Sequence, residues 1–144
     1  MDKIKSANNE NIRLLRKLAS KKYRKEYGKF VAEGMTLVKS IPDIVKVSSL
    51  FVKESAADKT EDILDRFCCP VFQVDDNVFD KAMETITPSG IAAIIDIERK
   101  DIRPPRDNSL VLDRISDPGN LGTIIRTAVA CNYSDVYLIN CADA

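Results

Sequence analysis

The stretch that decides the fold runs from residue 117 to residue 128 and reads Asp-Pro-Gly-Asn-Leu-Gly-Thr-Ile-Ile-Arg-Thr-Ala. It follows the short apolar run Leu110-Val111-Leu112-Asp113, which is typical of a buried strand. One proline and two glycines interrupt the pattern, and from Thr123 onward apolar residues return at helical spacing, at Ile124, Ala128 and Cys131. The stretch therefore predicts a strand, a tight loop and a helix. In open α/β sheets, ligands bind beside such loops, at the carboxyl ends of the strands.

Arg126 is the one charged side chain of the predicted helix start. It lies two positions after Ile124, about 200° further around a helix, so it faces away from the apolar stripe. Helical side chains lean toward the N-terminus, so Arg126 should point back over Gly122 and Gly119. A guanidinium above glycines at a helix N-terminus would suit a phosphate or a polarised hydroxyl. The alternative is that the glycines only make the turn and Arg126 is a solvated surface charge, and spacing alone leaves both open.

The pattern Asp117-Pro-Gly-Asn120-x-Gly122-x-x-x-Arg126-Thr127-Ala128-x-Ala130 resembles the first conserved motif of the SpoU (TrmH-type) RNA ribose methyltransferases of the SPOUT superfamily. The resemblance implies a 2′-O-methyltransferase that uses S-adenosylmethionine and works as a homodimer with a knotted α/β catalytic domain. By position, Arg126 matches the family's catalytic arginine and Asn120 an active-site asparagine. The resemblance assigns the shape of the motif loop to Asp117, Pro118, Gly119, Gly122 and Thr127.

The sequence given ends at Ala144, soon after the start of the expected catalytic domain. The second and third motifs of the family, which build most of the methyl-donor pocket and the knot, are not in it. We therefore expect this chain alone to be an RNA-binding and catalytically incomplete fragment.

Composition narrows the class of protein. The 144 residues allow one domain, or one domain and a piece of another, and 44% hydrophobic with 31% charged residues is typical of a soluble globular chain. No apolar run has the length of a membrane span, and the N-terminus lacks the apolar core of a signal peptide. The four cysteines show no C-x-x-C spacing, so we expect reduced thiols in a cytoplasmic protein, with Cys68 and Cys69 buried rather than ligating metal. There is no histidine, which excludes a histidine general base and histidine-containing zinc sites.

Positive charge is concentrated at the N-terminus, although the net charge is zero. Residues 1–30 contain ten basic and three acidic residues, a net charge of +7, which leaves −7 on the rest. We expect Asn8 or Asn9 to cap a helix that runs to about Tyr23. Its apolar stripe would consist of Ile12, Leu15, Leu18 and Ala19.

The basic residues of this region lie largely off that stripe and have few acidic partners, which favours contact with RNA over contact with lipid. The candidate RNA-binding residues are Arg13, Arg16, Lys17, Lys21, Lys22, Arg24 and Lys25. The alternative is the ordinary solvated face of an amphipathic helix. Tyr23 and Tyr27 lie among these basic residues, where they could stack on nucleobases or pack on the domain.

Strands and short helices alternate over the rest of the first hundred residues. Strands are expected at 30–32, 47–52, 70–74 and 91–95, with helices from Met35 to Pro42, from 57 to 67, and from a cap at Asp75 or Asp76 to Met83. This pattern predicts a small three-layer α/β/α domain with a mostly parallel or mixed sheet. Residues 5–97 resemble the ribosomal-protein-like substrate-binding domain that precedes the SpoU catalytic domain.

The charged segment around Pro104-Pro105 suits a linker, because consecutive prolines favour an extended backbone. We therefore expect an RNA substrate-binding domain at 1–98, a linker at 99–108, and the first β-α-β unit of a knotted methyltransferase domain at 109–144, its second strand being 135–139.

Two other functions stay open. The chain could be a non-enzymatic RNA-binding module. A dinucleotide-binding oxidoreductase is disfavoured, because Gly119-x-x-Gly122 lacks a third glycine and the strand that follows ends in Ile139-Asn140 rather than in an acid. The RNA partner that the family resemblance implies is ribosomal or transfer RNA.

Overall fold

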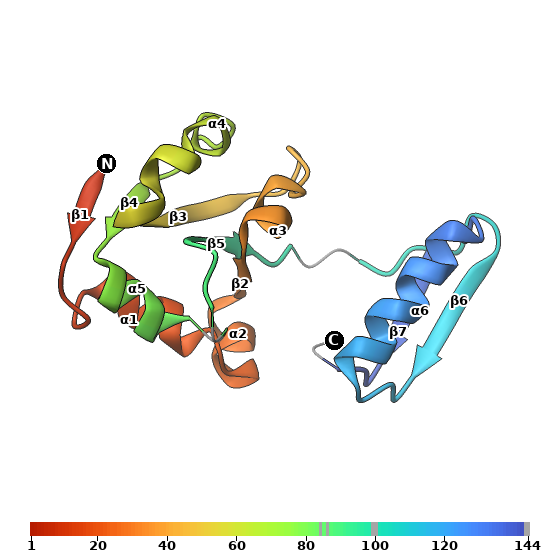
Figure 1. The fold of residues 1–144 in the computed structure, drawn as a ribbon. Helices are drawn as coiled ribbons and strands as arrows, with labels where there is room; N and C mark the ends of the chain where they lie inside the picture. The colour runs from red at the N-terminus through yellow and green to blue at the C-terminus, as the bar shows by residue number, and fades with distance from the viewer. Residues whose placement is uncertain (84, 86, 99–100, 143–144) are drawn as a thin grey trace. The chain divides into compact units, whose positions relative to one another are not determined.

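The computed structural model describes residues 1–83, 85, 87–98 and 101–142 and divides the chain into two compact units, Met1–Glu98 and Arg99–Ala144 (Figure 1). The predicted linker begins with residues 99 and 100, which lie outside the described residues, and residues 101–106 form neither helix nor strand. Within the described ranges, no helix combines the length and apolar character needed to cross a bilayer.

The first unit is built on a five-stranded mixed sheet of order β1-β4-β3-β5-β2. Strands β1, β4 and β3 are parallel, whereas β5 is antiparallel to both of its neighbours. The strands are β1 (Asp2–Ile4), β2 (Lys29–Glu33), β3 (Val47–Lys53), β4 (Val71–Val74) and β5 (Ile91–Asp96). Residues 91–95 of β5 are all buried, as expected for a strand that is covered on both faces.

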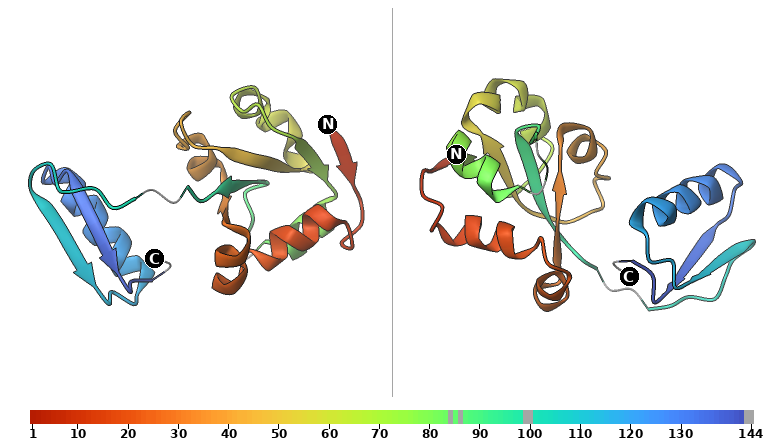
Figure 2. Two further views of the ribbon diagram at one scale, coloured as in Figure 1. Left: turned by 180° about the vertical axis from the view of Figure 1, so that it is seen from behind. Right: turned by 60° about the horizontal axis from the view of Figure 1, so that its bottom comes forward.

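Helices cover both faces of this sheet. On one face α1 (Glu10–Lys17) lies beside α5 (Asp76–Ala82), and their Ile12, Leu15 and Phe79 pack with Phe51 of β3 (Figure 2). On the other face Val38 of α3 (Met35–Lys39) and Ile63 of α4 (Glu61–Leu64) pack with Leu50 and Val52. Because successive strand residues point to opposite faces, β3 contributes to both cores. The predicted three-layer α/β/α domain is confirmed.

The predicted helix from Asn9 to Tyr23 is wrong beyond Lys17. Asn9 caps α1, its Oδ1 accepting the Asn11 amide at 2.9 Å, but the helix ends at Lys17 and a second helix, α2 (Lys21–Tyr27), follows. The Arg24 guanidinium of α2 donates to the carbonyls of Leu18 and Ala19 at 3.0 and 2.6 Å. The break is therefore stabilised by a side chain that satisfies backbone carbonyls at the end of α1. Leu18 is buried as expected, whereas Ala19 is exposed.

Three further details differ from the prediction. The helix expected at 57–67 is a 3₁₀ helix, η1 (Glu54–Lys59), followed by the single turn of α4. Thr60 lies between them, fully buried, and its hydroxyl donates to the Ala57 carbonyl at 2.8 Å. Strand β1 was not predicted at all. Cys68 is exposed rather than buried, and only Cys69 is partly covered, where burial raises the pKa of its thiol.

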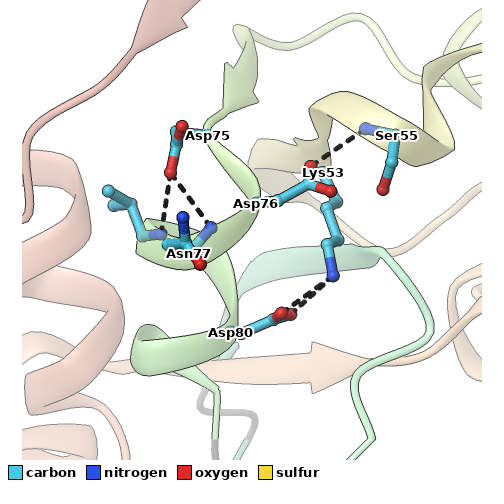
Figure 3. Close-up of polar contacts among 7 residues, drawn as sticks. Lys53, Ser55, Asp75, Asp76, Asn77 and Asp80 are labelled. Carbon is cyan, nitrogen blue, oxygen red and sulfur yellow. Dashed lines mark hydrogen bonds and ion pairs between the residues drawn. The ribbon is translucent and has the colours of Figure 1, made fainter.

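Polar contacts fix α5 to the end of β3 and to the start of η1 (Figure 3). The Asp75 carboxylate caps α5 by accepting the amides of Asn77 and Val78 at 3.0 and 3.3 Å, which confirms the predicted cap. Lys53 donates to both carboxylate oxygens of Asp80 at 2.8 and 3.0 Å, and these hydrogen bonds raise the pKa of Lys53. On the adjacent turn, Asp76 accepts the Ser55 amide at 3.0 Å, which lowers the pKa of Asp76.

The second unit is the predicted β-α-β arrangement. Strands β6 (Ser109–Asp113) and β7 (Asp135–Ile139) are parallel, with α6 (Pro118–Ala130) between them in the chain. Leu121 of α6 packs with Leu112 and Cys141 in a small core. The carboxyl ends of the two strands therefore lie at the same edge as the start of the motif helix.

Candidate active site and basic surface

Helix α6 begins earlier than the sequence pattern suggested. Asp117 is its N-cap, with Oδ1 accepting the Asn120 amide at 2.6 Å, and Pro118 occupies the first helical position. An acidic N-cap followed by proline is a strong helix start, and it outweighs the helix-disfavouring glycines. Gly119 and Gly122 therefore lie in the first two turns of α6, and the prediction that they form a loop is wrong.

Arg126 is exposed and its side chain runs back along the helix toward the N-terminus. Its Nη2 donates to Thr123 Oγ1 at 3.1 Å. A Cβ atom placed on Gly122 would lie 3.4 Å from Arg126 Nη1, so the guanidinium lies over the bare backbone of that glycine. The expected direction of Arg126 is confirmed for Gly122. At Gly119 the nearest atom is instead Asp117 Oδ1, 3.1 Å from such a Cβ.

The cap changes the expected chemistry of the helix terminus. The Asp117 carboxylate already accepts an amide there, so an anion at this terminus would compete with a fixed negative charge. The group available to bind an anion is therefore the Arg126 guanidinium, one to two turns further along. The same helix buries Leu121 and Ala128 on its opposite side, whereas Cys131, which we expected in the apolar stripe, is exposed.

The edge next to α6 is formed by the residues that follow the two strands. Arg114 after β6 and Asn140 after β7 both adopt positive φ angles, 57° and 52°, and the Arg114 amide donates to the Ile139 carbonyl at 2.9 Å. The buried Cys141 thiol donates to the Leu112 carbonyl at 3.3 Å, which ties the chain after β7 to β6. These contacts tie the two strand ends to each other. Sequence reasoning missed them, although the strand–asparagine junction at Asn140 is a recognisable signal for a left-handed residue.

The candidate RNA-binding residues lie on α1 and α2, and most of them are on the surface. The exposed members are Arg13, Arg16, Lys17, Lys21, Lys22 and Lys25. Arg24 is partly buried and bound to backbone carbonyls, so its place in the fold is structural.

Tyr23 and Tyr27 lie among these basic residues, with their ring centroids 6.2 Å apart. Lys17 Nζ lies 5.5 and 5.7 Å from the centroids of Tyr23 and Tyr27 and donates to Tyr27 Oη at 3.2 Å. Lys22 Nζ lies 5.7 Å from the Tyr23 centroid. The structure thus brings together cations and partly exposed aromatic rings, the two groups that contact phosphates and bases in RNA-binding proteins.

Comparison with protein families assigns both units. Residues 9–93 match the model of the MRM3-like substrate binding domain, and residues 107–144 match the SpoU rRNA Methylase family. The chain is 34% identical to the 23S rRNA (guanosine(2553)-2′-O)-methyltransferase RlmP of Bacillus subtilis over 141 residues, which cover 96% of this chain and 54% of RlmP. It is 30% identical to the mitochondrial rRNA methyltransferase 3 of Mus musculus, covering 87% of this chain and 32% of that protein.

Solved structures agree with these matches. An rRNA methyltransferase from Sinorhizobium meliloti superposes with a TM-score of 0.80 at 29% identity, covering 98% of this chain and 56% of that one. An AdoMet-bound rRNA methyltransferase from the same organism gives a TM-score of 0.76 at 30% identity, covering 95% and 54%. The chain spans about half the length of RlmP and of these structures. With both units matched and the motif helix in place, the chain belongs to the family of proteins with an MRM3-like substrate binding domain, and its second unit matches the SpoU rRNA Methylase family.

Proposed function

We propose that the protein containing these residues methylates the ribose 2′-hydroxyl of a ribosomal or transfer RNA, with S-adenosylmethionine as the methyl donor. The observation that carries the proposal is the position of Arg126, over Gly122 near the start of α6, within the segment that matches the SpoU family. The name of the Bacillus subtilis relative, a guanosine 2′-O-methyltransferase of 23S rRNA, supports the same reaction and substrate class. A ribosomal or transfer RNA substrate also fits the cytoplasmic location expected from the sequence.

Arg126 is assigned to substrate binding and charge stabilisation rather than to proton abstraction. Methyl transfer to an alcohol requires the hydroxyl proton to leave, but a guanidinium stays protonated in proteins and has no acceptor lone pair for that proton. Its guanidinium can bind the phosphate next to the ribose and favour the developing alkoxide, while the proton leaves through a phosphate oxygen or water. The exposed Asn120 side chain, six residues earlier on the same helix, is assigned to orienting the substrate through its amide.

The described residues do not by themselves enclose a methyl donor. Asp113, Arg114 and Asn140 at the carboxyl edge of β6 and β7 are all exposed. An adenosine needs an enclosed and largely apolar pocket, which this open edge does not provide. We therefore propose that S-adenosylmethionine binds to the complete protein rather than to this chain alone.

The first unit is proposed to bind the RNA through the exposed lysines and arginines of α1 and α2, with Tyr23 and Tyr27 between them. The support is the clustering of six exposed cations on two consecutive helices. A homodimer is proposed as well, because the second unit exposes the apolar side chains of Val111, Val129 and Ile139, by 59%, 68% and 47%. Sedimentation of the chain over a range of concentrations tests the dimer.

The decisive variant for the proposed activity is Arg126→Ala, made in the product of the complete reading frame that contains these residues. We expect transfer of labelled methyl groups to RNA to fall by at least about a hundredfold, because a charge-stabilising contact in the transition state is lost. The matched control is Arg106→Ala, an exposed arginine of the same unit outside the motif, which should retain activity. Near-normal transfer by Arg126→Ala would refute the assignment. RNA binding without any methyl transfer by the unaltered product would favour a non-enzymatic RNA-binding module.

A further inference from the structure

We propose that Thr123 is a positioning residue that holds the Arg126 guanidinium before substrate binds. This inference rests on the proposed function, in which Arg126 contacts the RNA. Thr123 was not among the residues singled out from the sequence. The structure assigns it through two contacts of one hydroxyl group.

The first contact is made with the helix itself. Thr123 Oγ1 donates to the Gly119 carbonyl at 2.9 Å, which fixes the direction of the hydroxyl hydrogen. A hydroxyl has one hydrogen and two acceptor sites, so the lone pairs of Thr123 then face away from that carbonyl. Arg126 Nη2 donates to this oxygen at 3.1 Å. The hydroxyl therefore connects the guanidinium to the first turn of α6.

The second element of the arrangement is the bare backbone of Gly122. A Cβ at this position would lie 3.4 Å from Arg126 Nη1, which is van der Waals contact. Thr123 contacts one terminal nitrogen and Gly122 leaves room for the other. Arginine carries five N–H donors in a fixed planar fork, so a single bond to Thr123 leaves most of them available for a phosphate.

Holding the side chain in advance has a physical advantage. A free arginine samples many rotamers and loses that freedom when it binds substrate, so a side chain that is already ordered binds with a smaller entropic cost. The same helix offers a comparison. Thr127 Oγ1 donates to the Thr123 carbonyl at 2.9 Å, the same threonine-to-backbone bond, but among the described residues its hydroxyl makes no hydrogen bond with the Arg126 guanidinium.

The test uses the 144-residue chain and its variants Thr123→Val and Thr123→Ser. Valine keeps the branched shape and removes the hydroxyl, whereas serine keeps the hydroxyl. The readout is the rotation of the Arg126 guanidinium about its Nε–Cζ bond, measured by NMR on arginine-labelled protein, with backbone amide shifts of α6 as a check that the helix is intact. Thr127→Val is the matched control for loss of a threonine-to-backbone bond.

We expect Thr123→Val to speed this rotation about fivefold, as expected for the loss of one solvent-exposed hydrogen bond, while Thr123→Ser and Thr127→Val stay near the unaltered rate. An unchanged rate in Thr123→Val, or equal effects of Thr123→Val and Thr127→Val, would overturn the inference.

The complete protein supplies a second readout. Thr123→Val should lower kcat for RNA methylation about fivefold with little change in KM for S-adenosylmethionine, and Thr123→Ser should restore kcat. If Thr123→Val released Arg126 but left kcat unchanged while Arg126→Ala abolished activity, the positioning role would be wrong. If the unaltered protein transferred no methyl group, the proposed function would fail, and the NMR comparison would still decide whether Thr123 holds Arg126.

Discussion

Asp96, at the end of β5, has a strongly lowered pKa, and it lies in the first unit rather than beside the motif. Its carboxylate contacts the Lys29 ammonium, accepts the Ser48 hydroxyl at 2.5 Å, and lies 3.2 Å from Lys46 Nζ. The hydrogen bond from Lys29, followed by that from Ser48, lowers the pKa of Asp96 to about 2 from 3.8. The cluster joins β5 to the starts of β2 and β3, so its role is to hold the edge of the sheet from which the chain leaves the first unit.

This cluster gives a pH-dependent prediction for Asp96→Asn. Because the folded pKa lies below the unfolded one, the carboxylate stabilises the fold above about pH 4, and this stability is lost as the pH falls through 2. We expect the free energy of unfolding of the variant to be about 1 kcal/mol lower near neutral pH, a modest loss because the side chain is partly solvated. The difference from the unaltered chain should shrink below about pH 4. Urea unfolding at several pH values measures it, with Asp101→Asn in the exposed linker as control. A difference that stayed constant down to about pH 2 would contradict the assignment.

The sequence was sufficient to predict the direction of the Arg126 side chain but not its hydrogen-bond partner. Helical geometry alone places a side chain over the preceding turn, and Gly122 is where the guanidinium lies. The bond to Thr123 depends on rotamers of two side chains, which spacing does not specify. Arg24 was grouped with the candidate RNA-binding residues because the sequence shows its charge. Its contacts with Leu18 and Ala19 depend on how the chain turns after α1, which the sequence does not show.

At the scale of elements, the cap of α5 provides a direct test of how this helix is held (Figure 3). We expect Asp75→Ala to destabilise the first unit by about 1 kcal/mol, because two amides of the first turn lose their acceptor. Asn77→Ala is the matched control, since only the backbone amide of Asn77 takes part in the cap. The measurement is the midpoint of urea unfolding, and equal midpoints for the two variants would show that the cap contributes nothing.

The elements that could be predicted are those whose patterns are set locally. Strands β3 and β5 follow from apolar runs, and α5 from its acidic cap, because these signals lie within the segment itself. Strand β1 was missed because Asp2–Ile4 has no periodicity and exists as a strand only beside β4. The early start of α6 was missed because the two glycines were given more weight than Asp117 and Pro118. The division of 57–67 depends on burial of Thr60, which is a tertiary effect.

At the scale of the whole chain, the proposed RNA surface and the proposed catalytic arginine belong to different compact units. Charge reversal at Arg13, Arg16 and Lys21 should therefore weaken RNA binding at least about tenfold and reduce its salt dependence by about two logarithmic units per decade of salt. Lys17 is left unchanged because its Nζ donates a hydrogen bond to Tyr27 Oη. Anisotropy with labelled RNA measures the affinity of the 144-residue chain.

The matched control carries the same change of charge on exposed lysines of other elements, Lys39, Lys59 and Lys81. It should lower affinity far less, because only long-range attraction is reduced. Equal losses in the two triple variants would show that α1 and α2 are not the contact surface.

The central claim is that the motif helix serves methylation of a ribose rather than of a base. The most direct measurement is to incubate the product of the complete reading frame with RNA and labelled S-adenosylmethionine, and then to hydrolyse the RNA in alkali. A 2′-O-methyl group blocks the attack of that hydroxyl on the neighbouring phosphate, so we expect the label to be recovered in an alkali-resistant dinucleotide. Label recovered in single nucleotides, which would place the methyl group on a base, would contradict it.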